Sequence, residues 1–243
     1  MESLKLIKAG GAIIEDPEAC AALLKDFAAI QGPKVLVHGG GRSASALAAR
    51  MGIPVKMVEG RRITDSAMLE VVTMVYGGLV NKNLVASLQA LGVNAVGLAG
   101  ADLNLILCDR RPVGEVDYGY VGDVRKVDVS LLSLLLDKGA VPVIAPLSHD
   151  GKGCLLNVNA DTIAAEVAQA LGAYYRVSLE YRFEKEGVLD SNGNLIPEID
   201  SDSFISLKAS GAVSGGMVPK IHNALEALGR GVGEVYIGKT LIH

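Results

Sequence analysis

The sequence has little cysteine and no long apolar run, and each lack argues against a class of protein. Its three cysteines, Cys20, Cys108 and Cys154, are scattered and have no C-x-x-C spacing, which favours free thiols in a reducing cytosol. No stretch approaches the ~18 consecutive apolar residues that a membrane span needs, and no apolar run of signal length stands at the N-terminus. We therefore expect a soluble, cytoplasmic protein with no membrane partner.

An excess of basic charge is also lacking. The chain has 23 basic and 27 acidic residues, with a formal net charge of −4, so its charge gives no sign of a nucleic-acid partner. Apolar residues, in contrast, make up 50% of the 243 residues. That share is enough for the core of one large α/β domain or of two small lobes.

Strand-like and helix-like segments alternate along the chain, with no linker, repeat or low-complexity run between them. This alternation predicts one α/β domain over residues 1–243, with a mainly parallel sheet covered on both faces by helices. Strands are expected at residues 4–9, 34–38, 93–100, 140–146, 174–179 and 234–238, hairpin arms at 104–109 and 120–127, and helices at 17–31, 43–52, 66–91, 129–138 and 217–229.

Two glycine turns, KAGG (8–11) and HGGG (38–41), follow expected strands. In open α/β sheets, ligands bind beyond the carboxyl ends of the strands. Glycine lets the backbone approach a ligand closely, and bare N–H groups at a helix start attract anions. One such turn would be no more than a tight turn, but two at successive strand ends, with Lys8 in the first, favour a phosphate or carboxylate site.

A second lysine and a carboxylate stand out further along the chain. Lys220 falls in the first turn of an expected helix, where the helix dipole favours anions rather than cations. It is either an ordinary surface lysine or one of two lysines, with Lys8, that surround a polyphosphate. Asp161 ends the segment NVNAD (157–161), in which short polar side chains alternate, and it stands where a helix N-cap is expected.

Two motifs point to nucleotide sites but lack the required context. GEVYIGKT (233–240) matches the P-loop pattern, yet its intervening residues are strand-like and no helix follows them. A dinucleotide site would need G-x-G-x-x-G after the first strand, and neither GGAIIE nor GGGRSAS supplies it. We therefore expect neither a P-loop nor nicotinamide chemistry.

Taken in order, five segments resemble the N-acetylglutamate kinase branch of the amino acid kinase family, and the similarity covers nearly the whole chain. The segments are IKAGG, VHGGGRSASALAARMGIPVKMVEGRRIT, DYGYVGDV, LLNVNADTIAAEVAQALGA and GGMVPKIHNAL. The resemblance implies a three-layer α/β/α sandwich, with an acylglutamate lobe at about 1–173 and a nucleotide lobe at about 174–243. It also implies ATP-dependent phosphorylation of the side-chain carboxylate of N-acetyl-L-glutamate, in arginine and ornithine biosynthesis.

The same resemblance assigns roles to residues. Lys8 and Lys220 would stabilise the transition state, and Asp161 would hold both lysines in place. The remaining assignments are Gly10 and Gly11 to phosphate, Gly40, Gly41, Arg62 and Asn157 to the substrate, and Arg42 as a possible contact of the acyl group.

Chemistry agrees with this set of residues. A carboxylate with a pKa near ~4.3 is ionised at neutral pH and attacks phosphorus without a general base. Catalysis is then positioning and charge neutralisation by lysines, backbone amides and Mg²⁺ carried on ATP, with no metal site of the protein's own.

Two departures from the branch pattern bear on nucleotide binding and assembly. EYRFEKE (180–186) stands where the branch has a motif with Asp-Val that lines the nucleotide, so the ATP contacts are left open. The N-terminal helical extension that accompanies arginine-inhibited hexamers is absent from this sequence, which favours a homodimer paired through a helix such as 66–91.

Two alternatives to the acetylglutamate reading stay open at this point. The chain could be a non-catalytic regulatory paralogue, or it could take N-succinyl-L-glutamate. A second carboxylate buried without a partner would cost several kcal/mol, and Arg42 and Arg61 are the candidate cations for it. An exposed Arg61 is the simpler expectation, which places acetyl ahead of succinyl.

Overall fold

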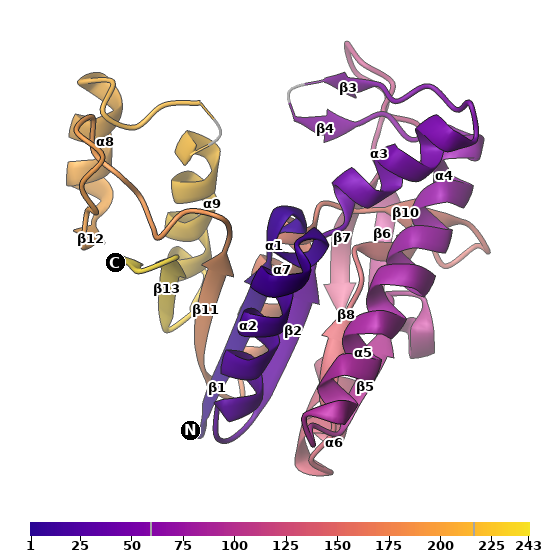
Figure 1. The fold of residues 1–243 in the computed structure, drawn as a ribbon, viewed down its shortest axis with the longest axis horizontal. Coiled ribbons are helices and arrows are strands. Elements are labelled where there is room, and N and C mark those ends of the chain that lie inside the picture. Colours follow the sequence, from indigo (N-terminus) through magenta and orange to yellow (C-terminus); the bar gives the residue numbers. More distant parts are fainter. Residues whose placement is uncertain (59, 216) are drawn as a thin grey trace.

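An eight-stranded sheet runs through the whole protein in a computed structural model, which describes residues 1–58, 60–215 and 217–243 (Figure 1). Its strands, in spatial order, are β12 (Glu198–Ile199), β14 (Thr240–Ile242), β13 (Glu234–Ile237), β11 (Arg176–Arg182), β1 (Ser3–Ala9), β2 (Lys34–His38), β8 (Val141–Ile144) and β5 (Ala95–Leu98). Only the β13–β14 pair among them is antiparallel. The prediction of a mainly parallel sheet is confirmed.

Helices cover both faces of this sheet and make three layers. One face carries α2 (Pro17–Ala29), α3 (Gly41–Arg50), α4 (Ser66–Val72) and α5 (Asn81–Ala90), and the other carries α6 (Val129–Asp137), α7 (Ala160–Leu171) and α9 (Met217–Gly229). The remaining helices are α1 (Gly11–Glu15), the π-helix η1 (Thr73–Val80), the 3₁₀ turn η2 (Asp102–Asn104) and α8 (Ser201–Ala209). The fold class predicted above is therefore confirmed.

Two small sheets extend the end of the molecule that carries the glycine turns. The first joins β10 (Leu155–Asn157), β9 (Leu147–His149), β6 (Ile106–Arg110) and β7 (Gly122–Val127). Its antiparallel β6–β7 pair is the predicted hairpin. The second is the ribbon of β3 (Met57–Val58) and β4 (Arg61–Arg62).

Alternation along β1 divides the core between the two faces. Leu4 and Leu6 belong to the cluster under α7 and α9, whereas Ile7 and Ala9 belong to the cluster under α2, α4 and α5. Because side chains of a strand alternate in direction, Lys8 follows Leu4 and Leu6 toward α7. The hydrophobic pattern thus sets the face on which the lysine lies.

The predicted helix 66–91 is continuous from Ser66 to Ala90, and by length and composition alone it could cross a membrane. Its middle is a π-helical segment, η1 (Thr73–Val80). One side of this helix packs into the core through residues such as Val72, Val75 and Leu84. These contacts are typical of a core helix in a globular domain.

The P-loop-like segment is not a phosphate loop. Gly238 and Lys239 connect β13 to β14 as an antiparallel hairpin. A P-loop requires a strand, a phosphate-wrapping loop and a helix in that order.

Candidate active site

Lys8 and Lys220 meet at a single carboxylate. Lys8 Nζ lies 2.7 Å from Asp161 Oδ1, and Lys220 Nζ lies 3.3 Å from Asp161 Oδ2. The two lysine side chains are 11% and 19% exposed, so both ammonium groups are sheltered from bulk water but still reachable. The structure therefore brings together the three residues that the resemblance assigned to catalysis.

Local structure explains why Asp161 is free to hold both lysines. The N-cap of α7 is Asn159, whose Oδ1 accepts hydrogen bonds from the N–H groups of Asp161 and Thr162. This corrects the expectation that Asp161 itself stands at the N-cap, since it lies inside the first turn. With capping done by Asn159, the Asp161 carboxylate faces the lysines.

Opposing effects act on the ionisation of Asp161. Burial alone would raise the pKa of this carboxyl, but the charges and hydrogen bonds of Lys8 and Lys220 outweigh it and hold the pKa below its ordinary value. Asp161 is therefore a carboxylate at neutral pH. One negative charge against two positive ones leaves a net positive centre, which suits a polyphosphate.

Two glycine turns face each other beside this centre. A Cβ added to Gly11 would lie 3.5 Å from the nitrogen of Gly40 and 3.6 Å from that of Gly41, so these backbone N–H groups lie close together. Gly11 and Gly41 begin α1 and α3, and the first N–H groups of a helix have no partner within it. The arrangement offers several backbone donors to one anion.

Gly10 requires a correction. Its N–H donates to the carbonyl oxygen of Arg182 at 2.8 Å, so this donor is already used and is not free for a phosphate. A Cβ at Gly10 would lie 3.2 Å from the same carbonyl oxygen. Gly10 thus permits the close approach of β1 and the end of β11, and the predicted phosphate contact remains a prediction for Gly11.

Glu15 links the two turns. Its Oε1 accepts hydrogen bonds from the backbone N–H of Ser43 at 2.6 Å and from Ser43 Oγ at 3.0 Å. One end of α1 is thereby tied to the start of α3. Sequence reasoning missed this link, because a Glu four residues after a glycine pair is not a recognisable signal.

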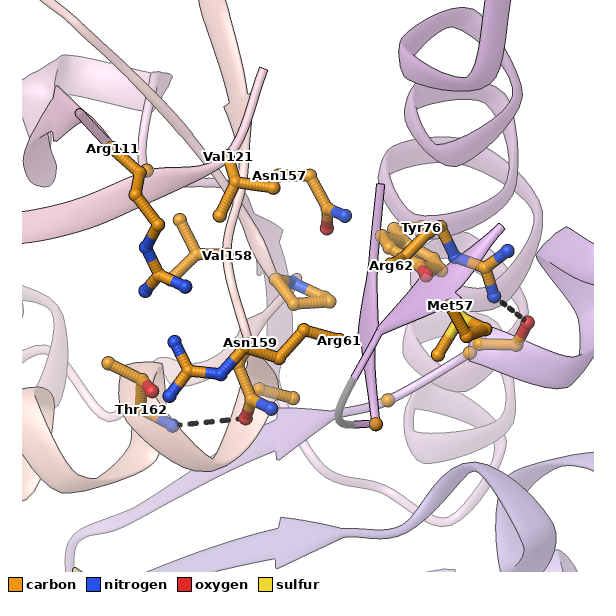
Figure 2. A pocket seen from close by; sticks show the side chains of 17 residues that line it. Met57, Arg61, Arg62, Tyr76, Arg111, Val121, Asn157, Val158, Asn159 and Thr162 are labelled. Carbon is orange, nitrogen blue, oxygen red and sulfur yellow. Dashed lines mark hydrogen bonds between the residues drawn. The ribbon is translucent and has the colours of Figure 1, made fainter. Parts of the chain in front are cut away.

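A pocket opens next to the second glycine turn, and Arg62 and Asn157 both line it (Figure 2). Arg62 is buried and donates from Nη2 to the carbonyl oxygen of Gly41 at 2.7 Å and to Ser45 Oγ at 2.9 Å. Asn157 Nδ2 donates to Thr64 Oγ1 at 2.9 Å, which orients its amide. Gly40 and Gly41 line the same pocket, so the four residues predicted for the substrate lie together.

Of the two arginines predicted as candidate contacts of the acyl group, Arg42 and Arg61, the structure has only one in the lining of this pocket as described. Arg42 is exposed on α3 and is not among the described residues that line this pocket. Arg61 does line it, and Figure 2 draws its guanidinium near that of Arg111, on the side of Thr162. Arg111 is already paired with Asp123, which leaves Arg61 as the better candidate cation.

Tyr76 was missed by sequence reasoning. It lies in the π-helical segment η1, and a Cβ at Gly40 would come within 3.0 Å of its ring. Burial raises the pKa of Tyr76, and the nearby Arg62 opposes that rise. A helical pattern does not distinguish a π segment from an α-helix, although π segments are frequent at functional sites.

His38, the residue before the second glycine turn, is fully buried and neutral. Its Nδ1 donates to the carbonyl oxygen of Gly39 at 2.7 Å, and its Nε2 accepts from Asn81 Nδ2 at 3.1 Å. The tautomer follows from the partners, because a carbonyl only accepts and an amide NH₂ only donates. Burial lowers the pKa of His38 to about 4, and the positive charge of Lys82 adds to this.

Comparison with known proteins gives consistent matches over nearly the whole chain. Residues 3–239 match the model of the amino acid kinase family. Proteins named acetylglutamate kinase from Parabacteroides distasonis and Bacteroides thetaiotaomicron are each 60% identical, over 98% and 97% of this chain and 94% and 93% of their own lengths. The crystal structure of smu.665 from Streptococcus mutans is similar with a TM-score of 0.84 at 31% identity, covering 98% of both chains.

Proposed function

Because this chain belongs to the amino acid kinase family, we propose that Lys8 and Lys220, held by Asp161, neutralise the phosphoryl group that it transfers. The reaction is ATP-dependent phosphorylation of the side-chain carboxylate of N-acetyl-L-glutamate, which gives N-acetylglutamyl 5-phosphate in arginine and ornithine biosynthesis. The observation that supports the roles of the residues is the shared carboxylate, with contacts of 2.7 Å and 3.3 Å to the two lysines.

The chemistry needs no general base. A substrate carboxylate oxygen attacks the γ-phosphorus, a new O–P bond forms, and the bond to the ADP oxygen breaks. The barrier comes from negative charge on the nucleophile, on the transferred group and on the leaving group. Two ammonium groups and the N–H groups of Gly11, Gly40 and Gly41 are placed to offset that charge without reorganisation.

The pocket of Arg62 and Asn157 is proposed as the site of the acylglutamate. A guanidinium forms paired, charge-assisted hydrogen bonds with a carboxylate, and Arg62 is the buried arginine of this pocket. The nucleotide is proposed to bind on the other side of the two lysines, toward residues 174–243. Mg²⁺ is proposed to arrive on the phosphates of ATP, where it would offset part of their negative charge.

A homodimer in the cytoplasm is the proposed working form. Met74 and Leu79, on the long helix 66–90, are 47% and 58% exposed. Exposed apolar side chains on one helix favour an interface with a second copy. Analytical ultracentrifugation of the wild type and of Leu79→Lys measures the oligomeric state and the effect of this helix on it.

The function is tested by trapping the acyl phosphate as a hydroxamate in the presence of ATP. We expect N-acetyl-L-glutamate to have a higher kcat/KM than N-succinyl-L-glutamate. One observation supports the succinyl alternative, which is that the side chain of Arg61 lines the pocket and has no ion pair among the described residues. If succinylglutamate reacts faster and Arg61→Ala alone removes that preference, the acyl group is succinyl. Arg42→Ala is the matched control, because Arg42 lies outside the pocket lining as described.

Arg62→Ala should raise the KM for the acylglutamate by about 10- to 100-fold, with little change in the KM for ATP. The reason is that charge-assisted hydrogen bonds contribute roughly 1.5–3 kcal/mol each, and this change removes them from one substrate only. Steady-state kinetics with each substrate varied in turn measures both constants. Arg50→Ala, at the exposed end of α3, is the control. An equal increase in both KM values would place Arg62 elsewhere than at the acylglutamate.

A further inference from the structure

The segment that departs from the family pattern, residues 180–186, lies at the catalytic lysines. Its first residues end β11, which pairs in parallel with β1 so that Tyr181 stands beside Lys8. Tyr181 belongs to the same core cluster as Leu4 and Leu6, so it faces α7 as Lys8 does. Phe183 is the first residue after β11, and its Cβ lies 3.5 Å from the position of a Cβ added to Gly10.

Two aromatic rings of this segment hold the ammonium group of Lys220. Lys220 Nζ lies 5.6 Å from the centroid of the Tyr181 ring and 5.5 Å from that of the Phe183 ring. Both distances fall within the ~6 Å over which a ring face attracts a cation. The third contact of this ammonium is the Asp161 carboxylate at 3.3 Å.

The position of the Lys220 ammonium group needs a further restraint that the position of the Lys8 ammonium group does not. Lys8 stands on the central strand β1 and is closer to Asp161, at 2.7 Å against 3.3 Å. Lys220 reaches the same carboxylate from the first turn of α9, through a flexible four-carbon chain with many rotamers. A carboxylate shared with another lysine restrains it only partly. Two ring faces at one ammonium reduce the positions that this side chain can take.

The ring of Tyr181, rather than its hydroxyl, accounts for this placement. The residue is 1% exposed, and its hydroxyl oxygen has no hydrogen-bond partner among the described residues. Burial raises the pKa of the Tyr181 hydroxyl, and the charge of Asp161 adds to that effect. A buried phenol without a partner is unfavourable, so the hydroxyl gives no reason for a tyrosine here, whereas the ring contacts Lys220.

We propose that Tyr181 and Phe183 are positioning residues that fix the ammonium group of Lys220 at the point where the transferred phosphoryl group is neutralised. This inference rests on the proposed role of Lys220. It also gives the altered segment a task in catalysis, in place of the nucleotide-lining motif that the family pattern would have there.

Kinetics of four variants test the proposal. Tyr181→Leu and Phe183→Leu should each lower kcat by about 3- to 30-fold, the range expected for a cation–π contact in a sheltered site, with the KM for the acylglutamate unchanged. Tyr181→Phe keeps the ring and should keep most of kcat. Tyr236→Leu is the matched control, because its ring lies 5.7 Å from Lys5 Nζ, another lysine–tyrosine pair of the same sheet. An equal loss in Tyr181→Phe and Tyr181→Leu would overturn the ring-based account.

A double-mutant cycle separates positioning of Lys220 from general packing. In a Lys220→Met background the two leucine substitutions should cause no further loss of kcat, because they act through the lysine that is gone. The same fold-loss in both backgrounds would mean that the rings act elsewhere and would end the proposal. If Lys220→Met alone retains more than about a tenth of kcat, the proposed role of the lysine fails first, and the two failures are thereby distinguished.

A spectroscopic measurement keeps the test valid if a leucine variant is poorly active for other reasons. Reductive ¹³C-methylation keeps the lysine charge, and the methyl resonance that disappears in Lys220→Met identifies Lys220. Ring currents should shift this resonance in the wild type and in Tyr181→Phe, and Tyr181→Leu and Phe183→Leu should each move it toward the position of an exposed lysine. A resonance that does not move in either leucine variant would contradict the ring contacts.

Discussion

Replacing Lys8 or Lys220 with methionine should lower kcat by about 10²–10³ while acylglutamate affinity changes only a few-fold. Each ammonium stabilises charge that develops in the transition state, and removal of one preorganised donor of this kind has that effect. Methionine keeps the length and apolar stem of the side chain. Hydroxamate formation gives kcat, and isothermal titration of the acylglutamate gives affinity.

Lys5→Met is the control for these variants. Lys5 lies on the same strand as Lys8 but points to the other face, and its ammonium lies over the ring of Tyr236. It should keep kcat close to that of the wild type. If Lys8→Met or Lys220→Met retains more than about a tenth of wild-type kcat, that lysine has no part in the chemical step.

The free energy of unfolding should fall by roughly 3 kcal/mol between pH 6.5 and pH 4 because of His38 alone. Its pKa is lowered from 6.5 to about 4 in the folded protein, a difference of about 2.5 at ~1.4 kcal/mol for each pH unit. In this window the unfolded chain binds a proton that the folded protein does not. The contribution of neutral His38 to the free energy of unfolding is therefore fully present above pH 6.5 and is lost as the pH falls toward 4. Below pH 4, titration of His38 causes no further loss.

Urea unfolding at pH 7 and at pH 4.5 measures this change. His38→Gln should remove most of the difference between the two pH values, since an amide still donates to Gly39 and accepts from Asn81 without titrating here. His222→Gln is the control, because the side chain of His222 is 62% exposed. A wild type and a His38→Gln variant with equal pH dependence would show that His38 does not titrate as its burial implies.

The sheet could be predicted from the alternation of strands and helices, and the grouping of Lys8, Asp161 and Lys220 from the resemblance to the family. Strand ends in a parallel sheet meet at one edge, so polar residues placed there come together. Period-two alternation also determines the face of Lys8. The resemblance of whole segments then placed Arg62 and Asn157 with the glycines, and the structure has all four at one pocket. Their roles in binding remain predictions.

What could not be predicted depends on register and on competition between similar groups. Asn159 and Asp161 are both able to cap α7, and only the backbone path shows that Asn159 does so. The sequence gives no sign that the N–H of Gly10 is used, but in the structure it donates to the carbonyl oxygen of Arg182 at the end of β11. The ring of Tyr181 reaches Lys220 because of strand pairing, not because of any local pattern.

The three residues that meet at the shared carboxylate come from the start, the middle and the end of the chain. β1, which carries Lys8, pairs with β11 so that Ser3 lies opposite Arg176, and Lys220 is added only by α9. Closing such long loops is slow in folding, since their entropy is lost before the contacts form. During synthesis, β1 can pair with β2 early, but its pairing with β11 must wait until residues 176–182 have left the ribosome. The two lysines can share Asp161 only after residue 220 has been made, so a chain that ends before it lacks the complete centre.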